Sequence, residues 1–157
     1  MIESAAKSKA KRRSQADFAC HVSFNAPRAQ VFDAIATING LRGWWTPITG
    51  GSPAPGGQLR FEFKGLDECI IMQVERARRP DSVHWTCAMH TELAAWLGTK
   101  VTFDLDERTA KTCDLRFRHV GLKPKLRCYT DCRQGWEHFL ASLVAYVERG
   151  KGMPFGV

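Results

Sequence analysis

Short runs of alternating hydrophobic and polar residues dominate the chain, and this period-two pattern is typical of half-buried β-strands. The first run is DFACHVSF, residues 17–24, in which every second side chain is apolar. Polar links join most of the later runs, as antiparallel hairpins require. These later runs cover residues 58–64, 68–78, 82–89, 99–106 and 111–120. The pattern therefore predicts an antiparallel sheet with one apolar face.

Two other segments repeat their apolar residues at helical spacing. The first is NAPRAQVFDAIAT, residues 25–37, with Pro27 in the first turn and Gly40 as the stop. The second is a long C-terminal helix with Thr130 as N-cap, Asp131 in the first turn and Gly150 as the stop. Its apolar stripe consists of Trp136, Phe139, Leu140, Leu143 and Val147.

A sheet with one apolar face must be covered, and the long C-terminal helix carries a matching apolar stripe. The pattern predicts an α+β fold in which a strongly curved antiparallel sheet wraps around that helix. A curved sheet that grips a single helix leaves space at its ends, and such space is typically a pocket.

Two adjacent tryptophans, Trp44 and Trp45, lie between the first helix and the segment GGSPAPGG, which we expect to be irregular. This position places them at the open end of the grip. One indole can face the mouth of a cavity and act as a gate, or both can plug the end of the core. Indoles suit such a boundary because the ring is buried while the N–H finds a polar partner.

Strand parity and helix spacing also select most of the candidate ligand-binding residues, and Trp96 joins them from the longer link at residues 90–98. Core packing explains each of them separately, but together they predict an aromatic-lined cavity. With the two tryptophans, the set consists of Phe61, Phe63, Trp85, Met89, Trp96, Phe103, Phe117, His119, Trp136, Phe139 and Leu140.

His119 is the polar member of this set, since it shares the inward face of residues 111–120 with apolar side chains. It is either an anchor or general base for a ligand, or a core histidine satisfied by a backbone carbonyl at the strand end. His84 and His21 fall on the opposite faces of their strands and are expected to face solvent.

Composition indicates a globular protein, because 44% of the 157 residues are hydrophobic and 25% are charged. We expect one domain at residues 16–157, preceded by a disordered basic tail at residues 1–15. Five lysines and arginines of that tail account for most of the formal net charge of +7. The tail is either a phosphate-binding arm or a solvated leader, and this uneven distribution argues against a nucleic-acid partner.

The sequence has neither the ~20-residue apolar run of a membrane span nor the apolar centre of a signal peptide. A cytoplasmic protein that does not bind membranes is therefore expected, with its six cysteines as thiols. No C-x-x-C pair is present, and Cys128 and Cys132 have no histidine at a finger spacing, so no metal site is expected.

Motifs for catalysis are also absent from the sequence. Asp104 and Asp106 share a strand face, but it is the outward one. There is no Gly-rich phosphate loop, nucleophile elbow or H-E-x-x-H. We therefore name no catalytic residue and expect no cofactor, although an enzyme that works by shaping its substrate needs no such motif.

Four segments carry a resemblance to a known superfamily: VFDAIATINGLRGWW, WLGTKVTFDLDE, LRFRHVGL and GWEHFLASLVAYVERGKGMP. They resemble the helix-grip superfamily called SRPBCC, which includes START lipid-transfer domains and plant pollen allergens. Within it they are most similar to the branch named after the ATPase activator of the ninety-kilodalton heat-shock chaperone. The resemblance spans residues 17–155 and implies a six- or seven-stranded sheet around an internal apolar cavity.

The inward aromatic set with its one inward histidine, taken together with the resemblance, leads to three functional hypotheses. The leading hypothesis is binding of a hydrophobic or aromatic small molecule between the sheet and the C-terminal helix. The alternatives are a chaperone-interaction protein of the stress response and an enzyme of the cyclase or hydrolase type. The eukaryotic cochaperone has an additional N-terminal chaperone-binding domain where this chain has a short basic tail, which argues against cochaperone activity. We expect a monomer or a weak homodimer.

Overall fold

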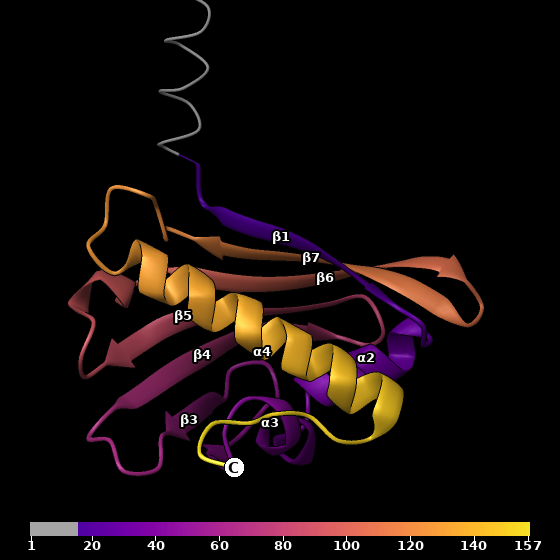
Figure 1. Cartoon of the computed structure of the whole chain (residues 1–157), viewed down its shortest axis with the longest axis horizontal. Helices are drawn as coiled ribbons and strands as arrows, with labels where there is room; N and C mark the ends of the chain where they lie inside the picture. The colour runs from indigo at the N-terminus through magenta and orange to yellow at the C-terminus, as the bar shows by residue number, and fades with distance from the viewer. Residues whose placement is uncertain (1–15) are drawn as a thin grey trace, which may run out of the picture.

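The computed structural model describes residues 16–157, and the predicted tail at residues 1–15 lies outside them. Its centre is a seven-stranded antiparallel sheet with the order β1-β7-β6-β5-β4-β3-β2 (Figure 1). The strands are β1 (Phe18–Phe24), β2 (Ile48–Gly51), β3 (Gln58–Glu62), β4 (Cys69–Arg78), β5 (Ser82–His90), β6 (Lys100–Thr109) and β7 (Thr112–Val120). The first strand of the chain thus pairs with the last one, and the hairpins between them complete the sheet.

One long helix, α4 (Tyr129–Arg149), runs across one face of this sheet (Figure 1). Two short helices, α2 (Arg28–Ile35) and α3 (Ile38–Trp44), lie beside the C-terminal half of α4, and the 3-10 helix η1 (Ala94–Trp96) links β5 to β6. The predicted α+β helix-grip architecture is confirmed. None of the helices in residues 16–157 has the length and apolarity needed to cross a membrane.

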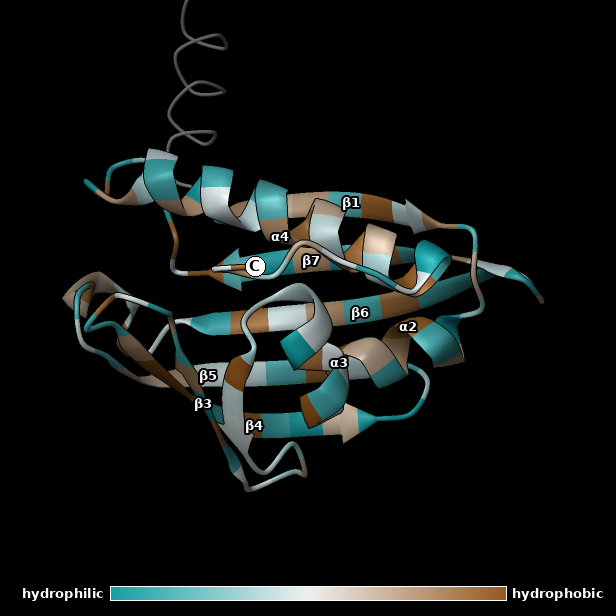
Figure 2. Cartoon of the chain, turned by 60° about the horizontal axis from the view of Figure 1, so that its bottom comes forward, coloured by the Kyte–Doolittle hydropathy of each residue, from teal (hydrophilic) through white to brown (hydrophobic). Residues whose placement is uncertain are grey.

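The apolar stripe of α4 is buried against the sheet and α2, as its spacing predicts. Figure 2 shows how hydrophobic and hydrophilic residues alternate along α4. Trp136, Leu140, Leu143 and Val147 are buried, whereas Phe139 is half-buried. Burying a large apolar side chain contributes about 1.5–3 kcal/mol. The stripe therefore holds α4 in place through several such contributions and fixes which of its side chains face the sheet.

The first helical segment differs from the prediction of a single helix that ends at Gly40. The chain instead forms α2 and α3, and Gly40 lies inside α3. The Thr37 hydroxyl caps α3 by accepting the Gly40 N–H at 3.1 Å. A β-carbon at Gly40 would collide with the carbonyl group of Ala34, so a glycine is needed where the helices meet. The Trp44 indole N–H donates to that carbonyl at 2.9 Å and ties the two helices together.

Two further boundaries differ from the prediction. The segment GGSPAPGG is not wholly irregular, since Gly50 and Gly51 belong to β2 and pair with Arg60 and Leu59 of β3. Strand pairing uses only backbone groups, which glycine supplies as other residues do. Helix α4 begins at Tyr129 rather than after Thr130, because turns at residues 123–129 already lead the chain into it. Asp131 is in its first turn and Gly150, with φ of 77°, ends it, as predicted.

The predicted inward orientation of Met89 is wrong, and a β-bulge is the reason. Met72 pairs with Cys87, but the preceding Ile71 pairs with Met89, so Ala88 is an extra residue in β5. One inserted residue reverses the alternation of faces. Met89 is consequently half-buried, and the next residue, His90, becomes buried in its place.

The chain after α4 turns back across α3, where it ends (Figure 1). The Ser142 hydroxyl on α4 donates to the Trp44 carbonyl at 2.8 Å and accepts the Met153 N–H at 2.6 Å. The Phe155 N–H donates to the Trp45 carbonyl at 2.8 Å. These bonds place the Phe155 ring against Phe63, at a centroid distance of 5.3 Å.

Candidate functional site

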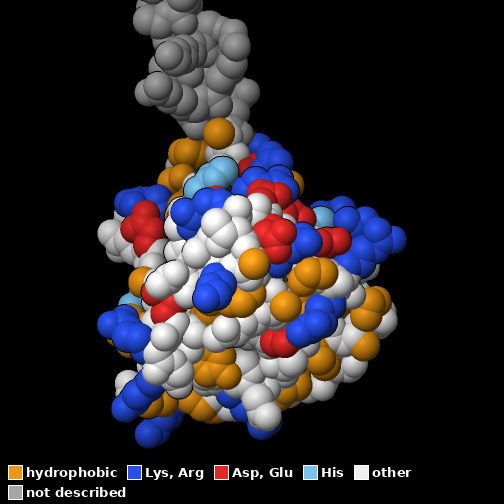
Figure 3. Space-filling model, turned by 90° about the vertical axis from the view of Figure 1, so that its right-hand side faces the viewer, with side chains coloured by type: hydrophobic (Ala, Val, Ile, Leu, Met, Phe, Trp, Pro, Cys, Tyr) orange, Lys and Arg blue, Asp and Glu red, His pale blue; other side chains and the backbone are white. Residues whose placement is uncertain are grey.

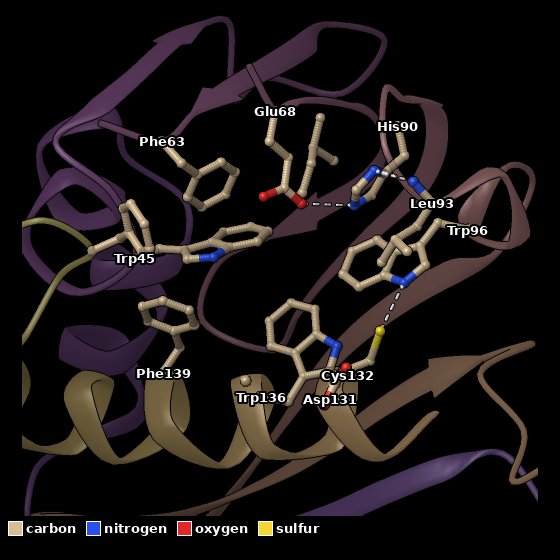
Figure 4. Close-up of a pocket in the computed structure, with 13 residues that line it drawn as sticks. Trp45, Phe63, Glu68, His90, Leu93, Trp96, Asp131, Cys132, Trp136 and Phe139 are labelled. Atoms are coloured by element: carbon tan, nitrogen blue, oxygen red, sulfur yellow. Dashed lines mark hydrogen bonds and ion pairs between the residues drawn. The ribbon is translucent and has the colours of Figure 1, made fainter. Parts of the chain in front are cut away.

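A cavity of about 250 Å³ lies between α4 and one end of the sheet, where β3 and β5 end and β4 begins (Figure 4). Six aromatic side chains form most of its wall, and they come from the residues that directly follow α3 and β3, from η1, from α4 and from the C-terminal segment. The lining residues are Trp45, Phe63, Glu68, Ile70, His90, Leu93, Trp96, Asp131, Cys132, Gly135, Trp136, Phe139 and Phe155.

Trp45 forms the wall between this cavity and the solid part of the core. On the core side, the centroid of its ring lies 4.2 Å from that of Phe61 and 6.0 Å from that of Trp85, and the Trp85 ring is nearly parallel to it. On the cavity side, the ring centroids of Trp136 and Phe139 lie 5.2 Å and 6.5 Å away. Offset and edge contacts at these distances add about 0.5–1.5 kcal/mol per pair beyond burial, so they stabilise the position of the Trp45 ring.

A chain of hydrogen bonds behind the cavity fixes the other two indoles. Trp136 Nε1 donates to His119 Nδ1 at 3.0 Å, which leaves the imidazole proton on Nε2. His119 Nε2 then donates to Thr99 Oγ1 at 2.9 Å, and the Thr99 hydroxyl donates to the Trp96 carbonyl at 2.6 Å. Trp96 and Trp136 are held nearly parallel, with centroids 6.0 Å apart.

His119 therefore supports the cavity wall without reaching the cavity. Its side chain is fully buried, and both ring nitrogens are engaged by protein groups. Burial lowers the pKa of His119 to about 4, so the ring is neutral at physiological pH and the proton arrangement above holds. Of the two roles considered for His119, the structure favours the satisfied core histidine, with an indole and a hydroxyl as partners in place of a backbone carbonyl.

Besides Asp131 on α4, the polar side chains of the cavity include the pair Glu68 and His90 (Figure 4). His90 Nδ1 accepts the backbone N–H groups of Leu93 at 2.9 Å and Glu92 at 3.2 Å. The proton of the neutral ring is therefore on Nε2, which lies 3.2 Å from Glu68 Oε1 and donates to it. The loop after β5 thus sets the tautomer that holds one carboxylate oxygen.

In this pair Glu68 carries a negative charge, and the neutral His90 ring supplies no positive charge to balance it. Burial lowers the pKa of His90 to about 4, so its contact with Glu68 at neutral pH is a hydrogen bond from a neutral ring and not an ion pair. Burial, assisted by the nearby charge of Glu92, raises the pKa of Glu68 above its ordinary value. No lysine or arginine is among the described residues that line the cavity.

The indole N–H of Trp45 is a second polar group available to a ligand. It makes no hydrogen bond to any of residues 16–157, although the Trp44 N–H beside it is satisfied. No fully buried side-chain nitrogen or oxygen in the described chain lacks a partner, so Trp45 Nε1 keeps some exposure, and Trp45 itself lines the cavity. It offers one donor to a carbonyl or hydroxyl oxygen.

Gly135 keeps the α4 side of the cavity open. It lies one residue before Trp136 and lines the cavity. A β-carbon built at Gly135 would meet no atom within 4 Å. Glycine inside a helix costs about 1 kcal/mol relative to alanine, and no close contact in the structure requires it here. A larger side chain at this position would extend from the cavity wall into open space.

Cys132 contributes a thiol to the same wall without being a nucleophile. The Trp96 indole N–H donates to its sulfur at 3.3 Å. Burial raises the pKa of Cys132 to about 12, so the reactive thiolate is not populated at neutral pH. Within residues 16–157, no group of His, Cys, Asp and Glu side chains is arranged to hold a metal ion.

The structure divides the ligand-binding residues predicted from the sequence into three groups. Trp45, Phe63, Trp96, Trp136 and Phe139 line the cavity. Met89 is on the other face of the sheet, for the reason given above. The remaining residues are buried in the core outside the cavity lining: Trp44, Phe61, Trp85, Phe103, Phe117, His119 and Leu140.

Sequence reasoning missed the polar residues of the cavity. Glu68 could have been found, because it has the same parity as the inward Ile70, Met72 and Val74. His90 had no such signal, since only the bulge at Ala88 turns it inward. Gly135 and Phe155 carry no periodic pattern that would place them at a cavity.

Comparison with known proteins supports the same fold and indicates a family. The profile of the family described as Activator of Hsp90 ATPase homolog 1-like protein matches residues 25–148. A comparison with curated proteins found no match.

Solved structures with the same fold come from several bacteria. The Aha1 dimer from Colwellia psychrerythraea is 26% identical, with a TM-score of 0.76, over 87% of this chain and 99% of that one. Protein SSP2350 from Staphylococcus saprophyticus is 18% identical, with a TM-score of 0.70, over 88% of this chain and 96% of that one. Protein MLL2253 from Mesorhizobium loti is 20% identical, with a TM-score of 0.70, over 84% of this chain and 98% of that one. The last two likenesses concern the fold alone.

Proposed function

The chain belongs to the family of Activator of Hsp90 ATPase homolog 1-like proteins, and on that premise we propose that it binds a small hydrophobic or aromatic molecule in the cavity between the sheet and α4. The observation that carries this proposal is the cavity of about 250 Å³ with its six aromatic walls. A mostly apolar concave site with a few polar groups is the usual form of a small-molecule site.

The size and chemistry of the cavity restrict its occupant. Sites for drug-sized molecules measure roughly 300–1,000 Å³, so this cavity suits a smaller ligand of one or two fused rings. Trp96 and Trp136 present nearly parallel flat surfaces, which favour a planar ligand. Glu68 and Trp45 Nε1 supply one acceptor and one donor that can orient it.

Filling the cavity from α4 tests the proposal directly. The experiment titrates the neutral fluorescent probe naphthylethanol into the wild-type protein and into the Gly135→Leu and Gly135→Ala variants. We expect Gly135→Leu to abolish binding, because Gly135 lines the cavity and no atom within 4 Å of a β-carbon there would hold a longer side chain away from it. Gly135→Ala is the control: like leucine, alanine has a higher helix propensity than glycine, but it adds only one carbon. This variant should retain binding.

Two results would contradict this function. The first is a wild-type protein that does not bind the probe and retains no small molecule in native mass spectrometry after gentle purification. The second is equal probe affinity in the wild type and in a folded Gly135→Leu variant, because binding would then take place elsewhere on the molecule.

A second candidate function is interaction with a heat-shock chaperone in the stress response. It is supported by the family and by the 26% identity with the Aha1 protein of Colwellia psychrerythraea. Adding the purified protein to the chaperone and measuring its ATPase rate separates the two candidates. Stimulation that persists in the Gly135→Leu variant would support a surface interaction independent of the cavity.

We further propose a cytoplasmic protein, either a monomer or a weak homodimer, without a nucleic-acid or membrane partner. All six cysteines are free thiols, as a reducing compartment favours. On the face drawn in Figure 3, Lys and Arg side chains are interspersed with Asp and Glu, which disfavours binding to a phosphate backbone. The homodimer is suggested by the dimeric Colwellia protein.

A further inference from the structure

We infer that the ligand is an amine, a small apolar body carrying one protonated amino group, and that the Glu68 carboxylate is its counter-ion. This inference rests on the proposed small-molecule function and narrows it to one chemical class. It excludes fatty acids and other carboxylates, which a hydrophobic cavity would otherwise accept. The reasons are the charge of the cavity wall, the state of Glu68 and the rings around it.

The ionisable groups around Glu68 make the cavity negative. His90 on β5 is neutral, and Glu92 in the loop after β5 adds a negative charge nearby. Helix α4 contributes Asp131 and the protonated thiol of Cys132. The formal charge of the whole chain is +7, yet no lysine or arginine of residues 16–157 lines this cavity.

Glu68 has an oxygen available for a ligand. Its Oε1 accepts from His90 Nε2, whereas Oε2 has no hydrogen-bond donor among the described residues and points towards Phe63 and Trp45 (Figure 4). Burial of this carboxylate without a cation raises its pKa, which means that its charged form is under-stabilised. An ammonium group beside Oε2 would supply the missing partner through a charge-assisted hydrogen bond.

The aromatic rings strengthen the preference for a cation. An ammonium group within about 6 Å of a ring centroid is attracted by the negative face of the ring, and the attraction grows when the site excludes water. Trp45 and Phe63 lie on the side of Glu68 towards which Oε2 points (Figure 4). The rest of the apolar wall accepts the hydrocarbon part of the ligand, whereas a ligand carboxylate would face Glu68 with a like charge.

Three probes that share one apolar body test this inference: naphthylethylamine, naphthylethanol and naphthylacetate. The experiment measures their affinities for the wild-type protein by titration calorimetry at pH 7. We expect the amine to bind at least about tenfold more tightly than the alcohol, which corresponds to about 1.4 kcal/mol. The carboxylate should bind most weakly of the three.

The variant Glu68→Gln identifies the group responsible. Glutamine keeps the length of the side chain and an oxygen that can accept from His90 Nε2, but it removes the charge. It should abolish the preference for the amine and retain binding of the alcohol. Glu75→Gln is the matched control, because Glu75 is an exposed glutamate of β4 outside the cavity lining, and it should behave as the wild type does.

Each outcome decides a different point. Equal binding of the three probes, or tightest binding of the carboxylate, would overturn the amine inference and leave the proposed function intact. An amine preference that persists in Glu68→Gln would remove Glu68 as the counter-ion and overturn the inference as well. If none of the probes binds to the wild type, the proposed function fails and the inference fails with it.

Discussion

Trp136 on α4 donates its indole N–H to His119 Nδ1 on β7 at 3.0 Å, in a part of the core where both side chains are buried. This bond joins the long helix to the sheet by polar groups amid apolar packing. Through Thr99 it also connects to the Trp96 backbone, so a single histidine positions two walls of the cavity. His119 is thus a positioning residue, in contrast to Glu68, which faces the cavity.

Replacing His119 by phenylalanine should destabilise the protein. The ring is retained, but the Trp136 N–H loses its acceptor and the Thr99 hydroxyl loses its donor. A buried polar group left without a partner costs about 1–3 kcal/mol, so we expect a loss of that size in the free energy of unfolding, measured with urea. Probe affinity should fall as well, because the Trp136 ring is no longer fixed.

The conservative variant Thr99→Ser tests whether a hydroxyl at residue 99 is sufficient to support His119. It keeps the hydroxyl that links His119 to the Trp96 carbonyl and should therefore retain both stability and probe binding. If His119→Phe kept full stability and lost only the ligand, the imidazole would be a ligand contact and the role assigned to it would be wrong.

Stability should fall on acidification from pH 6.5 towards pH 4. Burial lowers the pKa of both His90 and His119 from 6.5 to about 4 in the folded protein. In that window the unfolded chain binds more protons than the folded one, so the free energy of unfolding decreases as pH falls and is insensitive to these groups above pH 7. For His119 alone the loss at pH 4 is about 3 kcal/mol.

Thermal midpoints measured between pH 7 and pH 4.5 check this dependence. The His119→Phe variant lacks one of the two groups and should show a shallower decline than the wild type. Parallel declines in the two proteins would mean that His119 is protonated in the folded state and that its hydrogen bonds differ from those described.

The sequence predicted the framework of the fold because burial patterns report it directly. Alternation along residues 111–120 placed Phe117 and His119 on the inward face, and the α4 stripe placed Trp136 opposite them. These patterns indicate which face a side chain takes. They do not indicate whether the space in front of it is filled, which depends on the volumes of residues from distant segments. Trp85 and Trp96 were therefore both predicted as ligand-binding residues, although of the two only Trp96 lines the cavity.

The polar part of the site was harder to predict for a local reason. The bulge at Ala88 in β5 turns Met89 to the outward face and His90 to the inward face. Nothing in the sequence around Ala88 indicates this bulge. Phe155 reaches the cavity only because the chain after Gly150 turns back along α3, through backbone bonds such as that from Phe155 N to the Trp45 carbonyl. Such bonds leave no pattern in the sequence.

Gly135→Ala should stabilise the protein. Gly135 lies within α4, has no atom within 4 Å of a built β-carbon, and does not have a positive φ. Alanine is favoured over glycine inside a helix by about 0.5–1 kcal/mol, and we expect a rise of that size in urea denaturation. Gly43→Ala is the contrasting variant: its β-carbon would collide with the Tyr146 ring, so it should destabilise. A destabilised Gly135→Ala would show that the cavity is narrower than described.

Trp45 and Phe155 should respond differently to truncation, although both line the cavity. Trp45 is only 3% exposed and packs against Phe61 and Trp85 on the core side. Trp45→Ala should therefore cost about 3–5 kcal/mol, as expected for a fully buried aromatic residue, and binding to this variant should be measured per folded molecule. The gate considered from the sequence fits Phe155 better, because it is half-buried and belongs to the C-terminal segment.

Phe155→Ala should lower stability clearly less than Trp45→Ala, since less of its side chain is removed from water. It should accelerate release of the probe, because the ring that covers part of the cavity is lost while the backbone bond to Trp45 remains. Stopped-flow dissociation of naphthylethanol measures this rate. Unchanged release together with a stability loss as large as that of Trp45→Ala would make Phe155 a core residue, and ligands would then enter the cavity by another side.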